Sequence, residues 1–380
     1  MVKLGNVCTV VSGTTPKSNH LEYWDGNINW VTPAELKDDS DIIFESQRKI
    51  TEKAVADTSM KPFPAGTVLL SSRAPIGKVA IAGVEMYCNQ GFKNLICSEA
   101  IYNRYLYHYL KSKTDYLNSL GRGATFKEIS KNIVESIEIP LPPINEQRKI
   151  AAVLDKVSDL IAKRRQQLDK LDELVKSRFI EMFGDVPEEE KVTIAEICKI
   201  ITDGTHQPPK FTNTGIPFLF VSNIITNDIC YDAEKFISKE TYAELIKRTP
   251  IEIGDILLST VGSYGHPAIV KTDRRFCFQR HIAYLKPKSD MVKSEYLRGA
   301  ILSDNVQRQI DERVKGIAQK TLNLSEIRKI RLPLPPMKLQ EKFTTFVVQT
   351  DKSKLVIQKS LERLEILKKA LMQEYFVGGK

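Results

Sequence analysis

The sequence has little of what marks a membrane or secreted protein. No apolar run approaches the roughly 18 residues that a transmembrane helix needs, so we expect no membrane partner. The first residues, MVKLGNVCTVVSG, carry one lysine and only a short, interrupted apolar stretch, which is typical of mature structure and not of a signal peptide. These absences favour a cytoplasmic protein.

Cysteine is sparse and scattered. The six cysteines form no CxxC pair, and no cysteine or histidine cluster has the spacing of a zinc site. We therefore expect no metal site. We expect buried thiols in a reducing cytosol instead of a disulfide framework.

Motifs of the common enzyme classes are also missing. The sequence has no GxGxxG or P-loop spacing, no GxSxG elbow, no HExxH and no set of kinase motifs. A base-methylating enzyme needs a cofactor loop and a short Pro-Pro-aromatic motif, and QPPK at Gln207–Lys210 lacks the aromatic residue. We predict a protein that is not an enzyme, with no catalytic residues and no cofactor of its own.

Positive charge, by contrast, is in excess. The 380 residues include 56 Lys and Arg against 47 Asp and Glu, which gives a net charge of +9. This balance fits a nucleic-acid partner, because clustered Lys and Arg release counterions from a polyanion; an ordinary basic cytosolic protein would show the same balance. The chain is too long for one ordinary domain, and its length indicates two or three.

The chain repeats itself once. GRGATFKEISKNIVESIEIPLPP at Gly121–Pro143 matches VKGIAQKTLNLSEIRKIRLPLPP at Val314–Pro336, with an offset of 193 residues (336 − 143). Upstream, Ala65–Gly83 resembles Ile253–Lys271 at an offset of 188 (253 − 65). In the same region Cys88 and Gln90 resemble Cys277 and Gln279. Small insertions between matching halves are typical of loops, so we predict a duplicated domain and not a solenoid.

Each half begins with a globule of mixed pattern. Short runs rich in β-formers, such as GTVLLSS and DILLST, stand between Gly, Pro, Asn and Asp. Short helices are expected at Ile101–Ser112 and Ser294–Ser303. A proline-rich strand end, IPLPP or LPLPP, closes each globule. We predict an α+β fold with two tandem, repeated α/β globular domains, residues 1–143 and 185–336.

A long helix follows each globule. From Ile144 to about Phe183 there is no proline or glycine, and apolar residues recur in steps of four and three, which indicates a heptad seam. The ten seam positions are Ile150, Leu154, Val157, Ile161, Arg164, Leu168, Leu171, Val175, Arg178 and Met182. Their counterparts at an offset of 193 run from Phe343 to Tyr375. We predict a central spacer helix over residues 144–184 and a C-terminal spacer helix over 337–380, each roughly 57 Å long.

An amphipathic helix of this length has to bury its apolar stripe on another surface. The natural partner is the other copy, so we predict that the two helices form an antiparallel coiled coil. This pairing would place the globules at opposite ends, related by pseudo-twofold symmetry. The alternative is that each helix packs back on its own globule.

These features resemble the specificity subunit of type I restriction-modification systems, and the resemblance covers essentially the whole chain. In the first half it is carried by SGTTP at Ser12–Pro16, LLSSRAPIGKVAI at Leu69–Ile81, NQGF at Asn89–Phe92 and IPLPPINEQRKIAAVLD at Ile139–Asp155. In the second half it is carried by DGTHQPP at Asp203–Pro209, LLSTVGSYG at Leu257–Gly265, FQRH at Phe278–His281 and LPLPPMKLQEKF at Leu332–Phe343. The PLPPxxEQ-type junction before a long helix is the most specific of these motifs. The second junction departs from it, because Leu339 stands where the first has Glu146.

The resemblance implies that the chain binds double-stranded DNA and reads a bipartite, asymmetric target, one half with each target-recognition domain. It also implies that the paired helices set the gap between the halves and dock two methyltransferase subunits. Restriction subunits that translocate DNA with ATP would join the complex. Those partners, and not this chain, would bind S-adenosylmethionine and ATP.

Base-reading residues should be polar side chains on loops, and phosphate-binding residues should be Lys and Arg. Our candidates for contact with DNA in the first half are Thr14, Thr15, Lys17, Arg73, Gln90, Lys93, Arg122, Thr125 and Lys127. Those in the second half are Thr205, His206, Lys210, Ser263, Tyr264, Gln279, Arg280, Lys315, Gln319 and Lys320. Alternatively, Gln90 and Gln279 tie loops together, and Thr14 and Thr205 are turn residues.

An aromatic cluster, Tyr23, Trp24 and Trp30, precedes the first β-rich runs. We expect core packing from it in preference to base stacking. Two rival functions stay open at this point. One is a fused restriction-modification enzyme or a lone nuclease, and the other is a coiled-coil adaptor that binds only protein.

Overall fold

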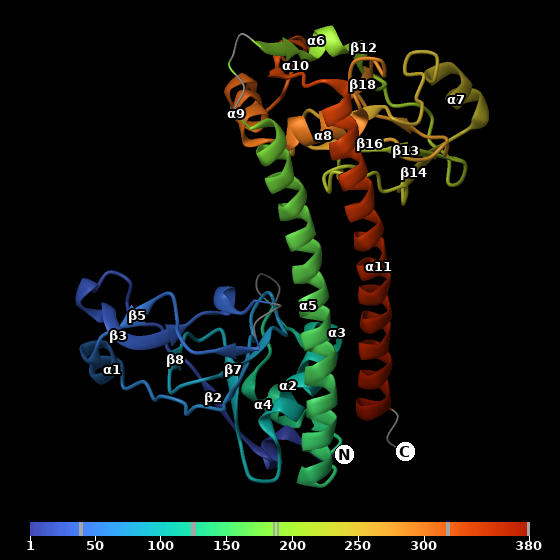
Figure 1. The fold of residues 1–380 in the computed structure, drawn as a ribbon. Helices are drawn as coiled ribbons and strands as arrows, with labels where there is room; N and C mark the ends of the chain where they lie inside the picture. Colours follow the sequence, from blue (N-terminus) through green and yellow to red (C-terminus); the bar gives the residue numbers. More distant parts are fainter. Residues whose placement is uncertain (38–40, 123–126, 185–186, 188–189, 317–319, 378–380) are drawn as a thin grey trace. The chain divides into compact units, whose positions relative to one another are not determined.

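The computed structural model describes residues 1–37, 41–122, 127–184, 187, 190–316 and 320–377 (Figure 1). The chain divides into two compact units. Unit 1 comprises Met1–Gln166 and Gln358–Lys380, and unit 2 comprises Gln167–Ile357. Within the described ranges, no helix is long and apolar enough to cross a membrane.

Unit 1 is built on a five-stranded sheet with the order β2-β9-β6-β7-β4. A three-stranded sheet, β5-β3-β8, and a two-stranded sheet, β1-β10, complete it. The strands are β1 Val2–Lys3, β2 Cys8–Ser12, β3 Trp24–Val31, β4 Ile42–Ile43, β5 Lys49–Ile50, β6 Val68–Leu70, β7 Val79–Ala82, β8 Tyr87–Cys88, β9 Lys93–Cys97 and β10 Glu138–Ile139. The short helices are α1 Glu52–Thr58, α2 Asn103–Ser112, α3 Thr114–Leu120 and α4 Lys131–Ser136.

Unit 2 is built on a four-stranded sheet with the order β12-β18-β15-β16, together with β14-β13-β17 and β11-β19. The strands are β11 Lys191–Thr193, β12 Cys198–Asp203, β13 Ile216–Leu219, β14 Lys235–Ile237, β15 Ile256–Ser259, β16 Pro267–Ile269, β17 Cys277–Phe278, β18 Ile282–Pro287 and β19 Arg331–Pro333. The short helices are α6 Ile194–Ile197, α7 Lys239–Leu245, α8 Ser294–Leu302, α9 Asp304–Arg313 and α10 Leu324–Lys329. The helices expected at Ile101–Ser112 and Ser294–Ser303 are thus confirmed as α2 and α8.

The strand order of unit 2 repeats that of unit 1. The sheet β12-β18-β15-β16 corresponds to β2-β9-β6-β7, and the sheets β14-β13-β17 and β11-β19 correspond to β5-β3-β8 and β1-β10. Both three-stranded sheets combine one antiparallel pair with one parallel pair. The edge strand β4, which pairs with β7 in parallel, is an addition of unit 1. The predicted domain duplication is therefore confirmed.

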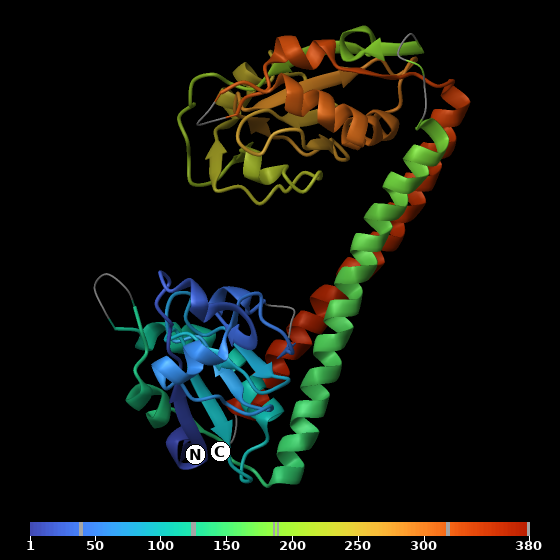
Figure 2. The same ribbon diagram turned by 90° about the vertical axis from the view of Figure 1, so that its left-hand side faces the viewer.

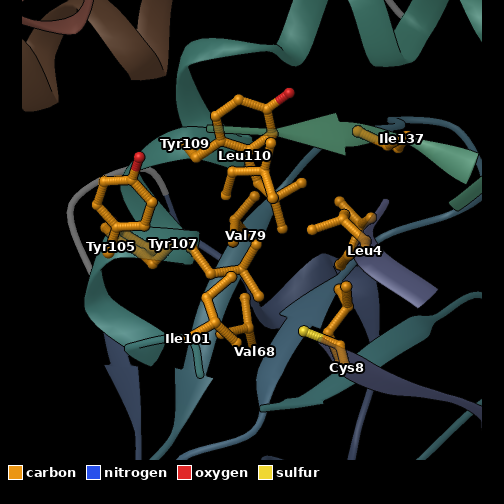
Figure 3. Close-up of a cluster of buried hydrophobic side chains, with 14 of the residues drawn as sticks. Leu4, Cys8, Val68, Val79, Ile101, Tyr105, Tyr107, Tyr109, Leu110 and Ile137 are labelled. Carbon is orange, nitrogen blue, oxygen red and sulfur yellow. The ribbon is translucent and has the colours of Figure 1, made fainter. Parts of the chain in front are cut away.

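Burial on both faces explains why the central strands of unit 1 are almost wholly apolar. Every residue of β6 and β7 is buried. Val68 packs with the tyrosines of α2 (Figure 3), and Leu70 belongs to the same cluster. Leu69, between them in the strand, packs with Phe92 on the opposite side. Because successive strand residues point to opposite faces, the sheet separates two cores, and polar residues are left for the strand ends and loops.

The two long helices are α5, Ile144–Phe183, and α11, Met337–Phe376, each of 40 residues. Both begin directly after a proline pair, which suits a helix start because proline blocks helix only for the residues before it. All twenty predicted seam positions are buried or half-buried. The predicted heptad seam is therefore confirmed.

In each unit, a stretch of α5 lies beside a stretch of α11 (Figure 2). In unit 1, Arg165 Nη2 is 2.7 Å from Glu365 Oε1. In unit 2, Lys354 forms an ion pair with Asp172. From the first of these pairs to the second, the residue on α5 lies closer to the end of its helix, and its partner on α11 lies closer to the start of that helix. The two helices therefore run antiparallel, as predicted.

The ends of both helices also enter the globular cores. In unit 1, Phe376 packs edge-to-face with Tyr105 and Tyr109, at ring-centroid distances of 5.3 and 5.5 Å. In unit 2, Phe343 packs in the same manner with Phe179 and Phe183. The alternative, in which each helix packs on its own globule, is thus also met in part. The core of each unit contains one end of α5 and the opposite end of α11.

A buried glutamine ties each long helix to its own globule. In unit 1, Gln147 Oε1 accepts the backbone N–H of Tyr102 at 2.8 Å, and its Nε2 donates to the carbonyls of Ala100 and Pro142. In unit 2, Gln340 makes the same three contacts with Lys293, Met291 and Pro335. Both glutamines are fully buried. The connection between each globule and its long helix is thus held by one side-chain amide, whose oxygen accepts and whose nitrogen donates hydrogen bonds.

Candidate nucleic-acid interface

The loop after β2 carries three of the candidate DNA contacts of unit 1, namely Thr14, Thr15 and Lys17, all exposed. Two buried indoles hold this loop. Trp30 Nε1 donates to the carbonyl of Thr14 at 2.9 Å, and Trp24 Nε1 donates to that of Lys17 at 3.3 Å. The two rings pack edge-to-face at 5.1 Å. The aromatic cluster is therefore a core that supports the loop, as expected.

The same loop is tied to the segment between β8 and β9. The backbone N–H of Thr14 donates to the carbonyl of Cys88 at 3.0 Å, and the hydroxyl of Thr15 contacts the side-chain amide of Gln90. Gly13 lies directly against this segment, where a Cβ would be 2.1 Å from the carbonyl oxygen of Cys88. The small residue therefore allows the close approach that places Thr15 beside Gln90.

Three charged side chains of unit 1 gather at the ends of β6 and β9. Glu128 accepts from Arg73 Nε at 3.0 Å and from Lys93 Nζ at 3.1 Å. Burial opposes ionisation of Glu128, but the hydrogen bonds from Lys93 and Arg73 outweigh it and lower the pKa of the carboxyl below its usual value. Lys93 is itself buried. Its charge is therefore used inside the unit, whereas Arg73 is exposed.

In unit 2, the loop after β12 has the corresponding position. The backbone N–H of Thr205 donates to the carbonyl of Phe278 at 3.0 Å, and the carbonyl of Thr205 accepts the backbone N–H of Arg280. His206 is exposed and lies 3.0 Å from the carboxylate of Asp203, which also accepts from Arg248 Nη2 at 2.5 Å. This loop is therefore held by a charged network in place of the indoles of unit 1.

Arg280 and His281 stand where β18 begins. Arg280 is exposed, and its Nε donates to His281 Nε2 at 3.4 Å. Burial first, and then repulsion by the guanidinium of Arg280, lowers the pKa of His281. The imidazole is therefore neutral at physiological pH, and its Nε2 accepts the hydrogen bond from Arg280.

The remaining candidates of unit 2 lie near the segment that joins α9 to α10. Lys315 and Lys320 are exposed, and the carbonyl of Lys320 accepts the N–H of Gly262 at 3.2 Å. Tyr264 donates its hydroxyl to Asp311 at 2.9 Å. Among the other candidates of the two units, the exposed ones are Lys210, Ser263, Arg122 and Lys127. Gln279 is half-buried. Thr125 and Gln319 lie outside the described residues.

The backbone contacts correct one match made from the sequence. The N–H of Asn89 donates to the carbonyl of Val31, and that of Gln279 donates to the carbonyl of Leu219. These are equivalent contacts of the parallel strand pairs β3·β8 and β13·β17. Gln279 is therefore the counterpart of Asn89, and Gln90 corresponds to Arg280. The match of Cys88 with Cys277 and of Gln90 with Gln279 was wrong by one residue, because the sequence pattern does not show where a loop contains one extra residue.

Sequence reasoning missed Glu128, Asp203 and Arg248, which organise the candidate residues. Acidic residues are poor candidates for contact with a polyanion, so charge alone gave no reason to choose them. The sequence repeat gave no reason to choose Arg248 either. Among the residues that the structure describes, no group of three or more His, Cys, Asp or Glu side chains is placed to hold a metal ion.

Comparison with known proteins connects this arrangement with one family. The family model of the type I restriction modification DNA specificity domain matches residues 1–173 and 188–366. The MjaIX specificity subunit of a type I restriction enzyme from Methanocaldococcus jannaschii is 30% identical over 401 aligned positions, which cover 99% of this chain and 92% of the relative. The EcoBI specificity subunit from Escherichia coli is 24% identical over 76% of this chain and 68% of its own length.

Solved structures share the fold. The S subunit of a type I restriction-modification system from M. genitalium superposes with a TM-score of 0.57 at 16% identity, over 98% of this chain and 95% of that one. A chain from a study of complex assembly and conformational transition of the type I R-M system superposes with the same TM-score at 19% identity, over 98% and 96%. The matched domain occurs twice and spans most of the chain. This protein therefore belongs to the family of type I restriction-modification specificity subunits.

Proposed function

We propose that this chain is the DNA-reading subunit of a type I restriction-modification complex. The target-recognition domains, residues 1–143 and 185–336, each read one half of a bipartite, asymmetric DNA target. The chain performs no chemistry itself. S-adenosylmethionine and ATP belong to the methyltransferase and restriction subunits that assemble with it.

One observation carries this proposal: equivalent loops of the two units present unlike side chains on the same scaffold. Thr14 and Thr205 make the same backbone contact, yet Gln90 in unit 1 corresponds to Arg280 in unit 2. Glutamine matches adenine and arginine matches guanine in the major groove. Two readers that share a fold and differ in these side chains suit a target whose halves differ in sequence.

The exposed apolar residues of the long helices support docking of methyltransferase subunits. Large apolar side chains outside the seam are normally rare on a helix that faces only water. On α5 the exposed ones are Val153, Leu160, Leu174 and Ile180, and on α11 they are Leu339, Val348, Leu355, Val356, Ile366 and Leu367. We propose that part of this surface is covered in the assembled complex.

Methylation mapping tests the proposal. The chain is expressed with its methyltransferase subunits in a host without other methylation, and modified bases are mapped across the genome. We expect a single motif with two unlike halves and a fixed gap, and we expect it to disappear when this gene is deleted. Methylation that persists without the chain, or that has no sequence preference with it, would contradict the proposed function.

A further inference from the structure

The two units differ sharply at one equivalent place beside the candidate reading loops. In unit 1, Arg73 and Arg122 form backbone bridges with Glu128, and in unit 2, Val261 and Lys315 form the matching bridges with Thr321. Ser12 pairs with Lys93 across the sheet, as Asp203 pairs with Ala283. Glu128, Arg73 and Lys93 therefore correspond to Thr321, Val261 and Ala283.

The side chains of unit 1 fill this place. Lys93 is buried, and its ammonium reaches Glu128, which is also held by Arg73. An ammonium and a guanidinium on one carboxylate form a compact cluster of ion pairs with a net charge of +1. Charged side chains of the protein thus stand between the strand ends and the segment around Glu128.

Unit 2 has three small, neutral residues at the same positions, and there a cavity of about 480 Å³ is open. Such a volume lies within the range of about 300–1,000 Å³ that is typical of small-molecule sites. The walls include Thr260, Thr321 and Ser325, whose hydroxyls can both donate and accept, and Leu322 supplies an apolar surface. The cavity therefore offers neutral groups that can donate to or accept from the polar edge of a nucleobase.

Arg280 and His281 also line this cavity. Arg280 is exposed, and none of the ion pairs formed by the described residues involves its guanidinium. The carboxylate of Asp203 lies in the same wall and is held by Arg248 and His206. An anion would meet this carboxylate, whereas a neutral base would not be repelled by it. A base is therefore favoured over a backbone phosphate.

We propose that this cavity is the base-reading site of unit 2 and that it takes a guanine, with Arg280 as the bidentate donor to O6 and N7. The planar guanidinium fork matches these two acceptors on the major-groove edge of the base, and the hydroxyls around the cavity can meet polar groups that the neighbouring base pairs expose in the same groove. In unit 1, the ion-paired side chains of Lys93, Glu128 and Arg73 stand at the equivalent positions. The inference rests on the proposed function and names the residue that gives unit 2 its specificity.

Three variants test this site through the methylation motif of the assembled complex. Arg280→Gln removes the fork, and the double variant Ala283→Lys/Thr321→Glu transplants the filling pair of unit 1 into the cavity. Lys199→Gln is the matched control, because it removes one exposed positive charge from the far end of β12. Thermal melting of each purified variant shows whether it folds.

We expect Arg280→Gln to reduce the preference for one guanine in one half-site by about 10- to 100-fold, while the other half-site and the gap stay the same. The double variant should change the same half-site, and Lys199→Gln should leave the motif intact. A uniform loss of methylation with an unchanged motif would make Arg280 a phosphate contact and overturn the inference, as would an unchanged motif in both cavity variants. Absence of any motif with the unaltered chain would instead overturn the proposed function, and this inference with it.

Discussion

Gln147 and Gln340 show how single residues determine the joint between globule and helix. Each amide accepts a backbone N–H at the start of α2 or α8. It also donates to two carbonyls, one just before that helix and one in the proline pair that precedes the long helix. Because both side chains are fully buried, water does not compete for the amide atoms that make these contacts. The loss of one amide removes three hydrogen bonds at once, which is more costly than the loss of one exposed hydrogen bond.

Gln147→Leu should destabilise unit 1 by about 2–4 kcal/mol, since leucine keeps the volume but satisfies none of the three backbone groups. Gln340→Leu should do the same to unit 2. Urea unfolding with tryptophan fluorescence reports the first change well, because both tryptophans, Trp24 and Trp30, lie in unit 1. Gln166→Leu, at an exposed position of α5, is the control and should cost little. A comparable loss in the control would show that the buried contacts are not the cause.

At the scale of elements, a polar clamp joins α2 to α5 in unit 1, and the described residues of unit 2 form no equivalent clamp. His108 is fully buried, and its Nε2 is 2.6 Å from Asp155 of α5. Arg104 of α2 bridges Asp155 and Asp41, at 2.9 Å to the latter. In unit 2 the residue equivalent to His108 is Gly299 (299 − 108 = 191, the offset of Lys293 from Tyr102), and a Cβ there would lie 2.8 Å from Phe179. Aromatic packing thus replaces the clamp.

The clamp makes the stability of unit 1 sensitive to acid. Burial lowers the pKa of His108 in spite of Asp155, and Lys368 and Arg104 lower it further; its buried Nδ1 has no hydrogen-bond partner. For Asp155, burial opposes ionisation, but hydrogen bonds from His108 and Arg104 outweigh it and lower the pKa of the carboxyl. Both groups hold fewer protons in the folded than in the unfolded chain. Their contributions are therefore present at neutral pH and are lost as the pH falls.

The histidine contribution should decline first, below about pH 6.5, where the unfolded chain begins to bind the proton that the folded chain resists. The carboxylate contribution should follow below about pH 4, through the lowered pKa of the folded state. We expect the melting temperature of unit 1 to fall between pH 7 and pH 5, and His108→Gln to make this dependence shallower. His206→Gln, at an exposed position of unit 2, should leave it unaltered. Equal slopes for the unaltered chain and His108→Gln would refute this role.

At the scale of the whole molecule, each compact unit contains part of both long helices. Because α5 and α11 run antiparallel, one residue inserted in one helix alone would put the seam out of register. A matched insertion in both helices keeps the seam continuous, provided that it adds one whole heptad. The proposal that the helices set the gap of the target can therefore be tested without breaking their pairing.

A heptad inserted after Arg164 in α5, with a second heptad at the paired position of α11 near Glu365, should lengthen the gap. Seven helical residues add about 10.5 Å, which is about three base pairs at 3.4 Å each. Methylation mapping should show both half-sites unchanged and separated by about three more base pairs. A single heptad in α5 is the comparison, and we expect it to abolish a defined gap. If the matched insertion left the gap as it was, the helices would not be the ruler.

Much of this architecture follows from the sequence by itself. The offset of 193 residues between the PLPP junctions, the uninterrupted stretch from Ile144 to Phe183 and its heptad seam are local patterns, and they predict the duplication and both long helices. Periodicity reports which residues of an element are buried, because burial repeats with the geometry of that element. It also indicates that two such seams pair, and the structure adds that their ends enter the globular cores.

Only the tertiary structure decided which candidate residues keep their charge for a partner. Lys93 and Arg280 look alike in the sequence, yet the ammonium of Lys93 is buried on Glu128, 35 positions away, while Arg280 is exposed beside an open cavity. Glu128, Lys93 and Arg73 form ion pairs in unit 1, whereas their counterparts Thr321, Ala283 and Val261 leave no charge at the same place in unit 2. Such outcomes depend on contacts between residues distant in the chain, whose energies are set by burial and by the neighbouring charge, and no local pattern records either.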